Sequence, residues 1–268
     1  MNHDPYTPPS AVVEDARLPL GEDVLIANGR SRPIHHGWKW IATGWELFKR
    51  QPGMWVLCLV SAYGAMGVVP WIVRIFSASL MLPAAICLKP LWPIVTAGFV
   101  AVAHAAFRGE RFNVGDLFAG CKRHTSRLVM VGFINLAVFA AILATLTAAI
   151  GADSAFGLFT GKVSPISSRA ILTAFVFYYL AISLWGIAVA FAPALVYLND
   201  ITVLKAIKMS AAACLKNIFP GLLFIVLFSI LMVLSALPLL LGLLVSVPVG
   251  IAALYGAYRD IFLQPAQS

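Results

Sequence analysis

The chain of 268 residues is 61% hydrophobic and 11% charged, and its Lys and Arg outnumber its Asp and Glu to give a net charge of +8. A soluble domain carries about 25% charged residues, so this composition excludes an ordinary soluble protein and indicates a membrane protein. The positive charge could suggest nucleic-acid binding, but the sequence shows no basic groove or RNA-binding motif, and we expect no nucleic-acid partner.

The N-terminal residues 1–32 are rich in proline and acidic positions and show no sustained hydrophobic periodicity. This composition predicts a disordered cytoplasmic tail. Met1 to Arg50 contains no uninterrupted apolar segment of signal-peptide length, so we expect the first span to direct membrane insertion itself. Residues 263–268 are predicted to form a short C-terminal tail.

Residues 34–50 are predicted to form an amphipathic helix, because apolar side chains recur at a 4-3-4-3 spacing. These side chains are Ile34, Trp38, Ile41, Trp45 and Phe48. Tryptophans on such a face suit the boundary between lipid headgroups and acyl chains. Lys49 and Arg50 close the helix, and Pro52-Gly53 then lets the chain turn into the membrane.

Six segments are long and apolar enough to cross a bilayer, which takes about 20 helical residues. The predicted spans are residues 54–75, 85–107, 128–150, 170–197, 219–237 and 240–258. The last two belong to one apolar stretch that a short turn near Leu237-Pro238 divides. The predicted fold class is therefore an all-α integral membrane protein with six transmembrane helices, within a membrane domain of residues 33–262.

The placement of Lys and Arg predicts the orientation of these spans. With both termini on one side, that side holds 15 of the 19 Lys and Arg, and the other side holds only Arg74, Lys89, Lys162 and Arg169. The more basic side is normally cytoplasmic. We therefore expect both termini in the cytoplasm, an arrangement that explains the net charge without a polyanionic partner.

The first span is preceded by a short basic segment, here called the joint, which connects it to the amphipathic helix. Similar joints precede the third and fifth spans. The three copies are "LFKRQPGMW" (residues 47–55), "AGCKRHTSRL" (119–128) and "ACLKNIFPGLL" (213–223). The ends of two even-numbered spans are also alike, "HAAFRGE" (104–110) and "YGAYRDI" (255–261). We interpret the chain as three tandem units, each an interfacial helix followed by a transmembrane hairpin. The alternative is convergence, since any cytoplasmic loop must carry charges and aromatic residues.

Nine residues are predicted to lie at the membrane interface: Trp38, Trp45, Lys49, Arg50, Lys122, Arg123, Lys216, Tyr258 and Arg259. No charged residue lies near the middle of a predicted span, where it would cost at least ~2.5–3.5 kcal/mol and would usually mark function. Arg74 and Lys89 are placed at span ends. Asn135 is the most polar mid-span residue and the best candidate for an intramembrane site, although a structural bond between helices is its commoner role.

The motifs of soluble chemistry are absent from the sequence. The four cysteines lack metal-binding spacing, and no phosphate-binding glycine loop, nucleophile elbow or HExxH motif occurs. We therefore expect no catalytic residues, no metal and no cofactor, and a protein that is not an enzyme.

Three stretches resemble a family of uncharacterised six-span bacterial inner-membrane proteins: "GWKWIATGWELFKRQPGMW" (37–55), "DLFAGCKR" (116–123) and "YGAYRDIF" (255–262). The resemblance covers about residues 33–262. More distantly, the chain is similar to the membrane domain attached to some glycerophosphodiester phosphodiesterases, whose catalytic domain has no counterpart here. The resemblance implies a location in the bacterial inner membrane and carries over no catalytic residues.

Three hypotheses of function follow. The first is a non-enzymatic protein that organises, binds or moves lipid-like molecules, with the bilayer as its partner. The second is a channel or transporter for small solutes, and the third is a scaffold whose partners are other membrane proteins. The oligomeric state is not predicted.

Overall fold

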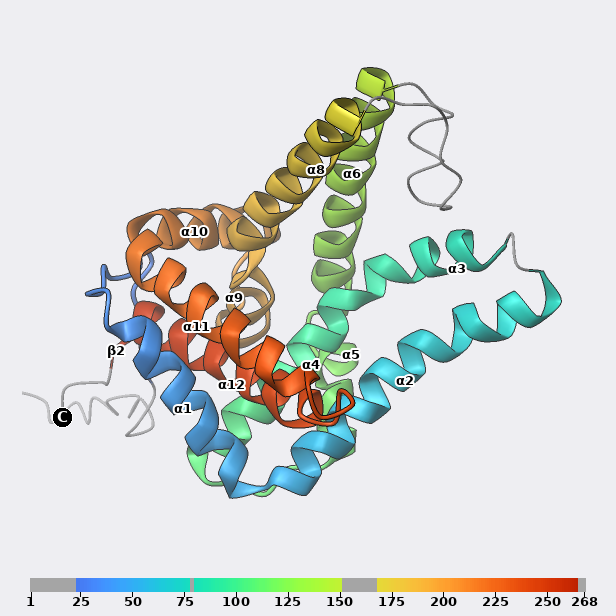
Figure 1. Ribbon diagram of the computed structural model, residues 1–268. Coiled ribbons are helices and arrows are strands. Elements are labelled where there is room, and N and C mark those ends of the chain that lie inside the picture. Colours follow the sequence, from blue (N-terminus) through green and yellow to red (C-terminus); the bar gives the residue numbers. More distant parts are fainter. Residues whose placement is uncertain (1–22, 78–79, 151–167, 265–268) are drawn as a thin grey trace, which may run out of the picture.

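The computed structural model describes residues 23–77, 80–150 and 168–264, which form helices and one small sheet (Figure 1). The first unit contains α1 (His36–Arg50), α2 (Pro52–Phe76), α3 (Met81–Leu88), the 3₁₀ turn η2 (Lys89–Leu91) and α4 (Trp92–Arg108). The second contains η3 (Val114–Phe118), α5 (Ala119–Lys122), α6 (Thr125–Ile150), α8 (Ser168–Val189) and α9 (Ala192–Asn199). The third contains α10 (Val203–Lys216), α11 (Ile218–Ala236) and α12 (Leu243–Phe262), and the strands are β1 (Val24–Leu25) and β2 (Leu263–Gln264).

Five stretches of helix among the described residues are long and apolar enough to cross a membrane. They are Pro52–Phe76, Pro83–Arg108, Thr125–Ala148, Leu172–Asn199 and Ile218–Ala236. Only between 6% and 39% of the most apolar window of each stretch is buried inside the protein. Side chains this apolar must be covered by lipid. The predicted fold class, an all-α membrane protein, is confirmed.

The sixth predicted span, residues 240–258, corresponds to α12, which is not among those five stretches. Two features distinguish this helix. Its last turns include Arg259 and Asp260, and most of its side chains are buried against other helices rather than exposed. It also begins later than predicted, because Leu239 and Leu240 adopt positive φ angles in the turn that precedes it.

A break of one or two residues separates each amphipathic segment from the next long helix. Gln51 stands between α1 and α2, Arg123 and His124 between α5 and α6, and Asn217 between α10 and α11. Pro52 occupies the start of α2, where a missing N–H costs nothing. The joint of the second unit lacks Pro-Gly, and there the chain changes direction at His124, whose φ is 59°.

The second and third amphipathic segments each pack against the hairpin of the preceding unit. The first packs against the hairpin of the third unit, so the contacts between units form a ring. Helix α1 contacts α12 and α11, the η3–α5 segment contacts α4, and α10 contacts α8 and α9. The three hairpins are α2 with α3–α4 (hairpin one), α6 with α8–α9 (hairpin two) and α11 with α12 (hairpin three). This cyclic packing agrees with the predicted three tandem units.

Small residues allow these contacts to be close. A Cβ added to Gly44 of α1 would collide with the Val249 carbonyl of α12, and one added to Gly98 of α4 would collide with the Leu117 carbonyl of η3. In the third joint, the hydroxyl of buried Ser210 on α10 accepts a hydrogen bond of 3.1 Å from the Phe191 N–H. Close backbone approach of this kind is how membrane helices associate without a hydrophobic driving force.

The segment before α1 differs from the predicted disordered tail. Residues 24 and 25 pair antiparallel with residues 264 and 263, and Asp23 pairs with Arg259 at 2.5 Å. Asn217 also holds the segment, accepting from the Arg32 N–H and donating to the Arg30 carbonyl. Backbone pairing and ionic contacts order this polar stretch. Neither requires a hydrophobic pattern in the sequence, so the order could not be predicted from such a pattern. The predicted tails at 1–22 and 265–268 lie outside the described residues.

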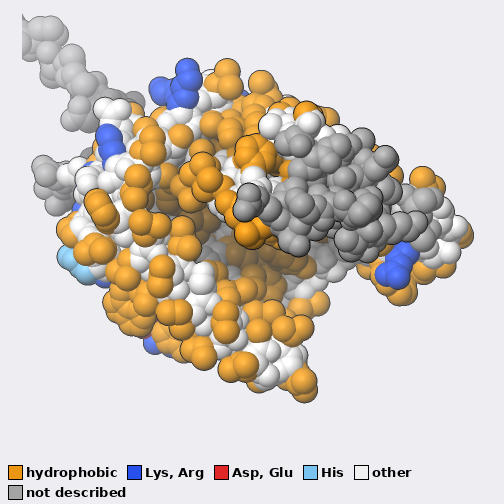
Figure 2. Space-filling view, turned by 45° about the horizontal axis from the view of Figure 1, so that its top comes forward, with side chains coloured by type: hydrophobic (Ala, Val, Ile, Leu, Met, Phe, Trp, Pro, Cys, Tyr) orange, Lys and Arg blue, Asp and Glu red, His pale blue; other side chains and the backbone are white. Residues whose placement is uncertain are grey.

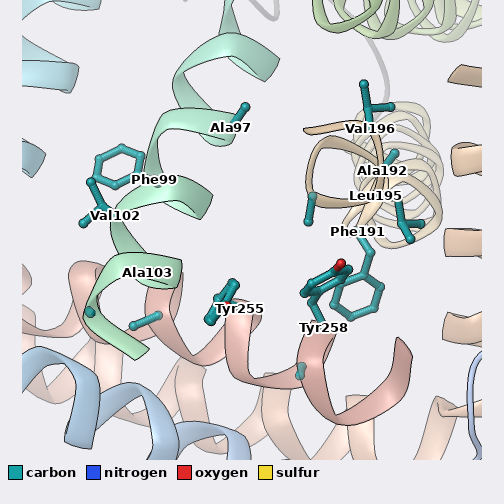
Figure 3. Packing of buried hydrophobic residues seen from close by; sticks show 14 of the residues in the cluster. Ala97, Phe99, Val102, Ala103, Phe191, Ala192, Leu195, Val196, Tyr255 and Tyr258 are labelled. Carbon is teal, nitrogen blue, oxygen red and sulfur yellow. The ribbon is translucent and has the colours of Figure 1, made fainter. Parts of the chain in front are cut away.

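The buried core lies where α4, α9 and α12 meet, at the end of the molecule that also holds α1, α5 and α10. Figure 3 shows Tyr255 and Tyr258 of α12 lying between α4 and α9, next to Phe191. Beyond this core the hairpins diverge: in Figure 1, α6–α8 extends upward while α2–α3 extends to the right. The face shown in Figure 2 is largely hydrophobic and is hollowed near its middle.

Candidate functional site

A cavity of about 170 Å³, here called the central cavity, lies at the junction of the three hairpins. Its walls come from α2, α4, the α8–α9 break and α12. The lining residues are Tyr63, Trp92, Val95, Thr96, Phe99, Val100, Ala190, Phe191, Ala194, Ile251, Leu254, Tyr255 and Tyr258. The cavity forms because the hairpins pack together at one end and then separate.

Three polar groups in this lining have partners. The Tyr258 hydroxyl donates to Asn199 Oδ1, the Tyr255 hydroxyl lies 2.8 Å from His104 Nδ1, and the Thr96 hydroxyl donates to a carbonyl of its own helix at 3.0 Å. The cavity therefore presents mainly ring faces and aliphatic groups to a ligand, as sites for apolar molecules do.

A second cavity of about 460 Å³, here called the lateral cavity, lies between hairpins one and two. It is lined by Met66, Pro70, Ala85, Leu88, Lys89, Trp92, Asn135, Leu136, Phe139, Ile182, Trp185, Gly186 and Val189. Trp92 lines both cavities, and its ring meets Tyr63 edge-on with centroids 5.3 Å apart. Trp92 therefore forms part of the wall between the central cavity and the lateral cavity.

Asn135, the intramembrane candidate from the sequence, lines the lateral cavity. Its Oδ1 accepts a hydrogen bond of 3.0 Å from Trp185 Nε1, which joins α6 to α8. Asn135 therefore makes the interhelical bond that the sequence favoured and also faces a cavity. Lys89, placed at a span end from the sequence, faces the same cavity, with Nζ 4.1 Å from the centroid of the Phe139 ring.

Three predicted interface residues hold the helix ends together. Arg50 donates to the Ala106 carbonyl at 2.5 Å and to the Phe107 carbonyl at 3.1 Å, at the end of α4. Arg259 lies over the Phe107 ring at 3.7 Å, and Tyr258 reaches Asn199 at the end of α9. These contacts connect the ends of α4, α9 and α12 at what we call the basic end of the molecule.

The other predicted interface residues lie on the surface or near it. Trp38 and Trp45 are 59% and 44% exposed, and Trp45 stacks on Phe48. Lys49 pairs with Glu46 at 2.8 Å, Lys216 donates to the Asn28 carbonyl at 2.8 Å, and Arg123 donates to His124 at 3.0 Å. Lys122 is exposed on α5.

One polar cluster was not expected from the sequence. Arg32 pairs with Asp260 at 2.9 Å, while His36 Nδ1 lies 2.6 Å and Trp40 Nε1 2.9 Å from the same carboxylate. Asp260 thus fixes α1 to the end of α12. The partners are more than 200 positions apart, and no local pattern marks them. The cavity-lining apolar residues were also missed, since apolar side chains that face a cavity and those that face lipid look the same in a sequence.

Reactive and metal-binding chemistry has little support in the described part of the chain. No three His, Cys, Asp or Glu side chains there lie close enough to hold a metal ion. Burial raises the pKa of the Cys214 thiol to about 11, only partly offset by a hydrogen bond with Ser210. A thiol with such a pKa stays protonated near neutrality and is a poor nucleophile.

The fold and the two cavities define a helical membrane protein with apolar spaces between its hairpins. Comparison with protein-family models, curated proteins and solved structures gave no match to this chain.

Proposed function

We propose that this is a multi-pass protein of the bacterial inner membrane, with both termini in the cytoplasm, that binds or moves lipid-like molecules without changing them chemically. The observation that carries the proposal is the central cavity, which all three hairpins line with mainly hydrophobic residues. Such a space, bounded by membrane-spanning helices, is reached most readily from the acyl-chain region.

The sizes of the cavities support an elongated apolar ligand. The lateral cavity, about 460 Å³, falls within the usual range of ligand pockets, while the central cavity, about 170 Å³, is smaller. A chain that occupied both would pass Trp92. Each methylene taken out of water is worth about 0.8 kcal/mol, although a ligand that arrives from the bilayer gains packing rather than burial.

The proposed orientation rests on charge. The basic end holds Arg50, Lys216 and Arg259, and the joints of all three units lie beside it. The positive-inside rule favours the cytoplasm for this end. The exposed Trp38 and Trp45 on α1 suit the headgroup layer on the same side.

A pair of matched substitutions tests the function. Val100 lines the central cavity, whereas Val60 is exposed on α2 and lines neither cavity. We expect Val100→Phe to reduce the lipid retained by purified protein, and any acceleration of phospholipid flip-flop in vesicles, by several-fold because the added ring fills the space. Val60→Phe makes the same change on the lipid-facing side and should leave both lipid retention and flip-flop unchanged.

Lipid retention is measured by native mass spectrometry of the detergent-solubilised protein, and flip-flop by accessibility of labelled phospholipids in reconstituted vesicles. If the wild-type protein neither retains lipid nor accelerates flip-flop, the proposed function is wrong. Equal effects of the two substitutions would show that the central cavity is not the site.

A further inference from the structure

Lys89 lies farther inside a stretch long enough to span the membrane than Arg74, Arg108 and Arg127, which all lie within two residues of an end of their stretches. The stretch runs from Pro83 to Arg108, so Lys89 is six residues, or about 9 Å of helix rise, from its start. Its ammonium group lies over the Phe139 ring of α6, at 4.1 Å from the centroid.

The position of Phe139 places this ammonium beside the interior of the α6 span rather than at its end. Phe139 is nine residues before Ala148, the end of the α6 span, which corresponds to about 13 Å along the helix axis. The hydrocarbon core is about 30 Å thick. A lysine that only snorkels to the headgroups would point toward the hairpin tip. Lys89 instead lines the lateral cavity.

The charge of Lys89 has no acidic partner among the described residues, whose ion pairs involve other side chains. The Phe139 ring offsets part of the cost of holding a cation there, because its face is electron-rich. A neighbouring anion would offset considerably more, since attraction between opposite charges is strong where water is scarce.

A second donor faces the same space. Trp185 Nε1 donates to Asn135 Oδ1 and so fixes the orientation of the amide. Within the described part of the chain the amide NH₂ of Asn135 donates to no protein acceptor, and Asn135 and Lys89 both line the lateral cavity. The cavity thus offers a cation and an amide donor in otherwise apolar walls that include Met66, Leu136 and Ile182.

We propose that the lateral cavity binds the anionic headgroup of an amphiphile, with its carboxylate or phosphate on Lys89 and the Asn135 amide. The hydrocarbon chain lies along the apolar wall toward Trp92 and the central cavity. This inference rests on the proposed function and narrows it from lipid-like molecules in general to negatively charged ones. Charge complementarity favours this occupant over zwitterionic lipids, in which a cationic group beside the phosphate offsets its attraction to Lys89.

The test compares headgroups on identical acyl chains. Purified full-length protein is incubated in detergent with equimolar dioleoyl phosphatidylglycerol and dioleoyl phosphatidylcholine, and bound lipid is counted by native mass spectrometry. We expect the wild type to prefer phosphatidylglycerol by about tenfold, because the cationic group of phosphatidylcholine weakens the attraction of its phosphate to Lys89. Separate incubations with oleate and with inorganic phosphate distinguish a carboxylate ligand from a phosphate-bearing lipid and from the anion alone.

Three variants assign the preference to Lys89. Lys89→Gln removes the charge and should abolish the preference, while Lys89→Arg keeps the charge and should retain it. Arg74→Gln is the matched control, since Arg74 is an exposed basic residue near the end of α2 that lines neither cavity. Lys89→Gln should still retain phosphatidylcholine as the wild type does, which would show that its loss of preference is not a folding defect.

Equal binding of the two phospholipids by the wild type would overturn this inference while leaving the proposed function intact. So would a loss of the preference in Arg74→Gln as large as that in Lys89→Gln. Absence of any bound lipid in the wild type would overturn both. Displacement of phosphatidylglycerol by inorganic phosphate alone would mean that the site binds a free anion, and the amphiphile would then be the wrong ligand.

Discussion

Asp260 shows how one carboxylate can join two helices that are distant in sequence. Its oxygens are shared among Arg32, His36 and Trp40, so α1 and the segment before it are held to the end of α12. Hydrogen bonds to a charged group contribute about 1.5–3 kcal/mol each, more than neutral ones. The pair between Lys49 and Glu46, which is largely exposed, contributes little by comparison.

Two cysteines on the amphipathic segments should differ in reactivity. Cys121 on α5 is exposed, whereas the Cys214 thiol donates to the Ile187 carbonyl at 3.1 Å and burial raises its pKa to about 11. At pH 8 only about one Cys214 thiol in a thousand is ionised. A maleimide should therefore modify Cys121 rapidly and Cys214 very slowly, with the Cys214 rate rising as the pH approaches 11.

The measurement is mass spectrometry of the peptides after timed labelling at pH 7, 8 and 9. Cys121→Ser should remove the fast-labelling peptide on this side of the protein, and Cys214→Ser should leave the labelling rate unchanged. Rapid labelling of Cys214 at pH 7 would contradict the burial described for α10.

At the scale of elements, the contact between α1 and α12 depends on the absence of side chains. Gly44 lies against the Val249 carbonyl, so Gly44→Ala must push the two helices apart. Overpacking of this kind costs about 1–3 kcal/mol. We expect Gly44→Ala to have a lower melting temperature than the wild type in detergent. Unfolding is measured by intrinsic tryptophan fluorescence.

Gly53 provides the control for that substitution. It lies in the first turn of α2, and a Cβ there would meet nothing within 4 Å. Gly53→Ala should leave the melting temperature unchanged or raise it slightly, because alanine is favoured over glycine in helices by about 1 kcal/mol. Equal destabilisation by both substitutions would show that the close approach of α1 to α12 is not what Gly44 provides.

The elements themselves could largely be predicted from the sequence, because length, apolar content and the basic joints are local signals. The predicted interfacial helix 34–50 corresponds to α1, and the corner at Pro52 is where α2 begins. Predictions failed where order depends on distant partners. The pairing of residues 24–25 with 263–264 and the contact of the Lys89 ammonium with Phe139 both depend on distant segments, which no spacing within a helix reveals.

At the scale of the whole molecule, three hairpins pack at the basic end and diverge beyond it, so the spaces between them open among membrane-spanning helices. A channel or an ion-coupled transporter usually needs an intramembrane carboxylate or helix ends directed at its substrate. Within the described residues no Asp or Glu lines either cavity. The linings favour a ligand that is mostly hydrocarbon.

The central claim is that these cavities hold a lipid-like molecule in the membrane. Electron cryomicroscopy of the protein in nanodiscs that contain phosphatidylglycerol tests it most directly, with a bound antibody fragment to aid alignment of this small protein. We expect elongated density that begins beside Lys89 and Asn135, passes Trp92 and enters the central cavity. Hairpins closed against one another, with both cavities filled by protein side chains and no lipid density between them, would contradict the account.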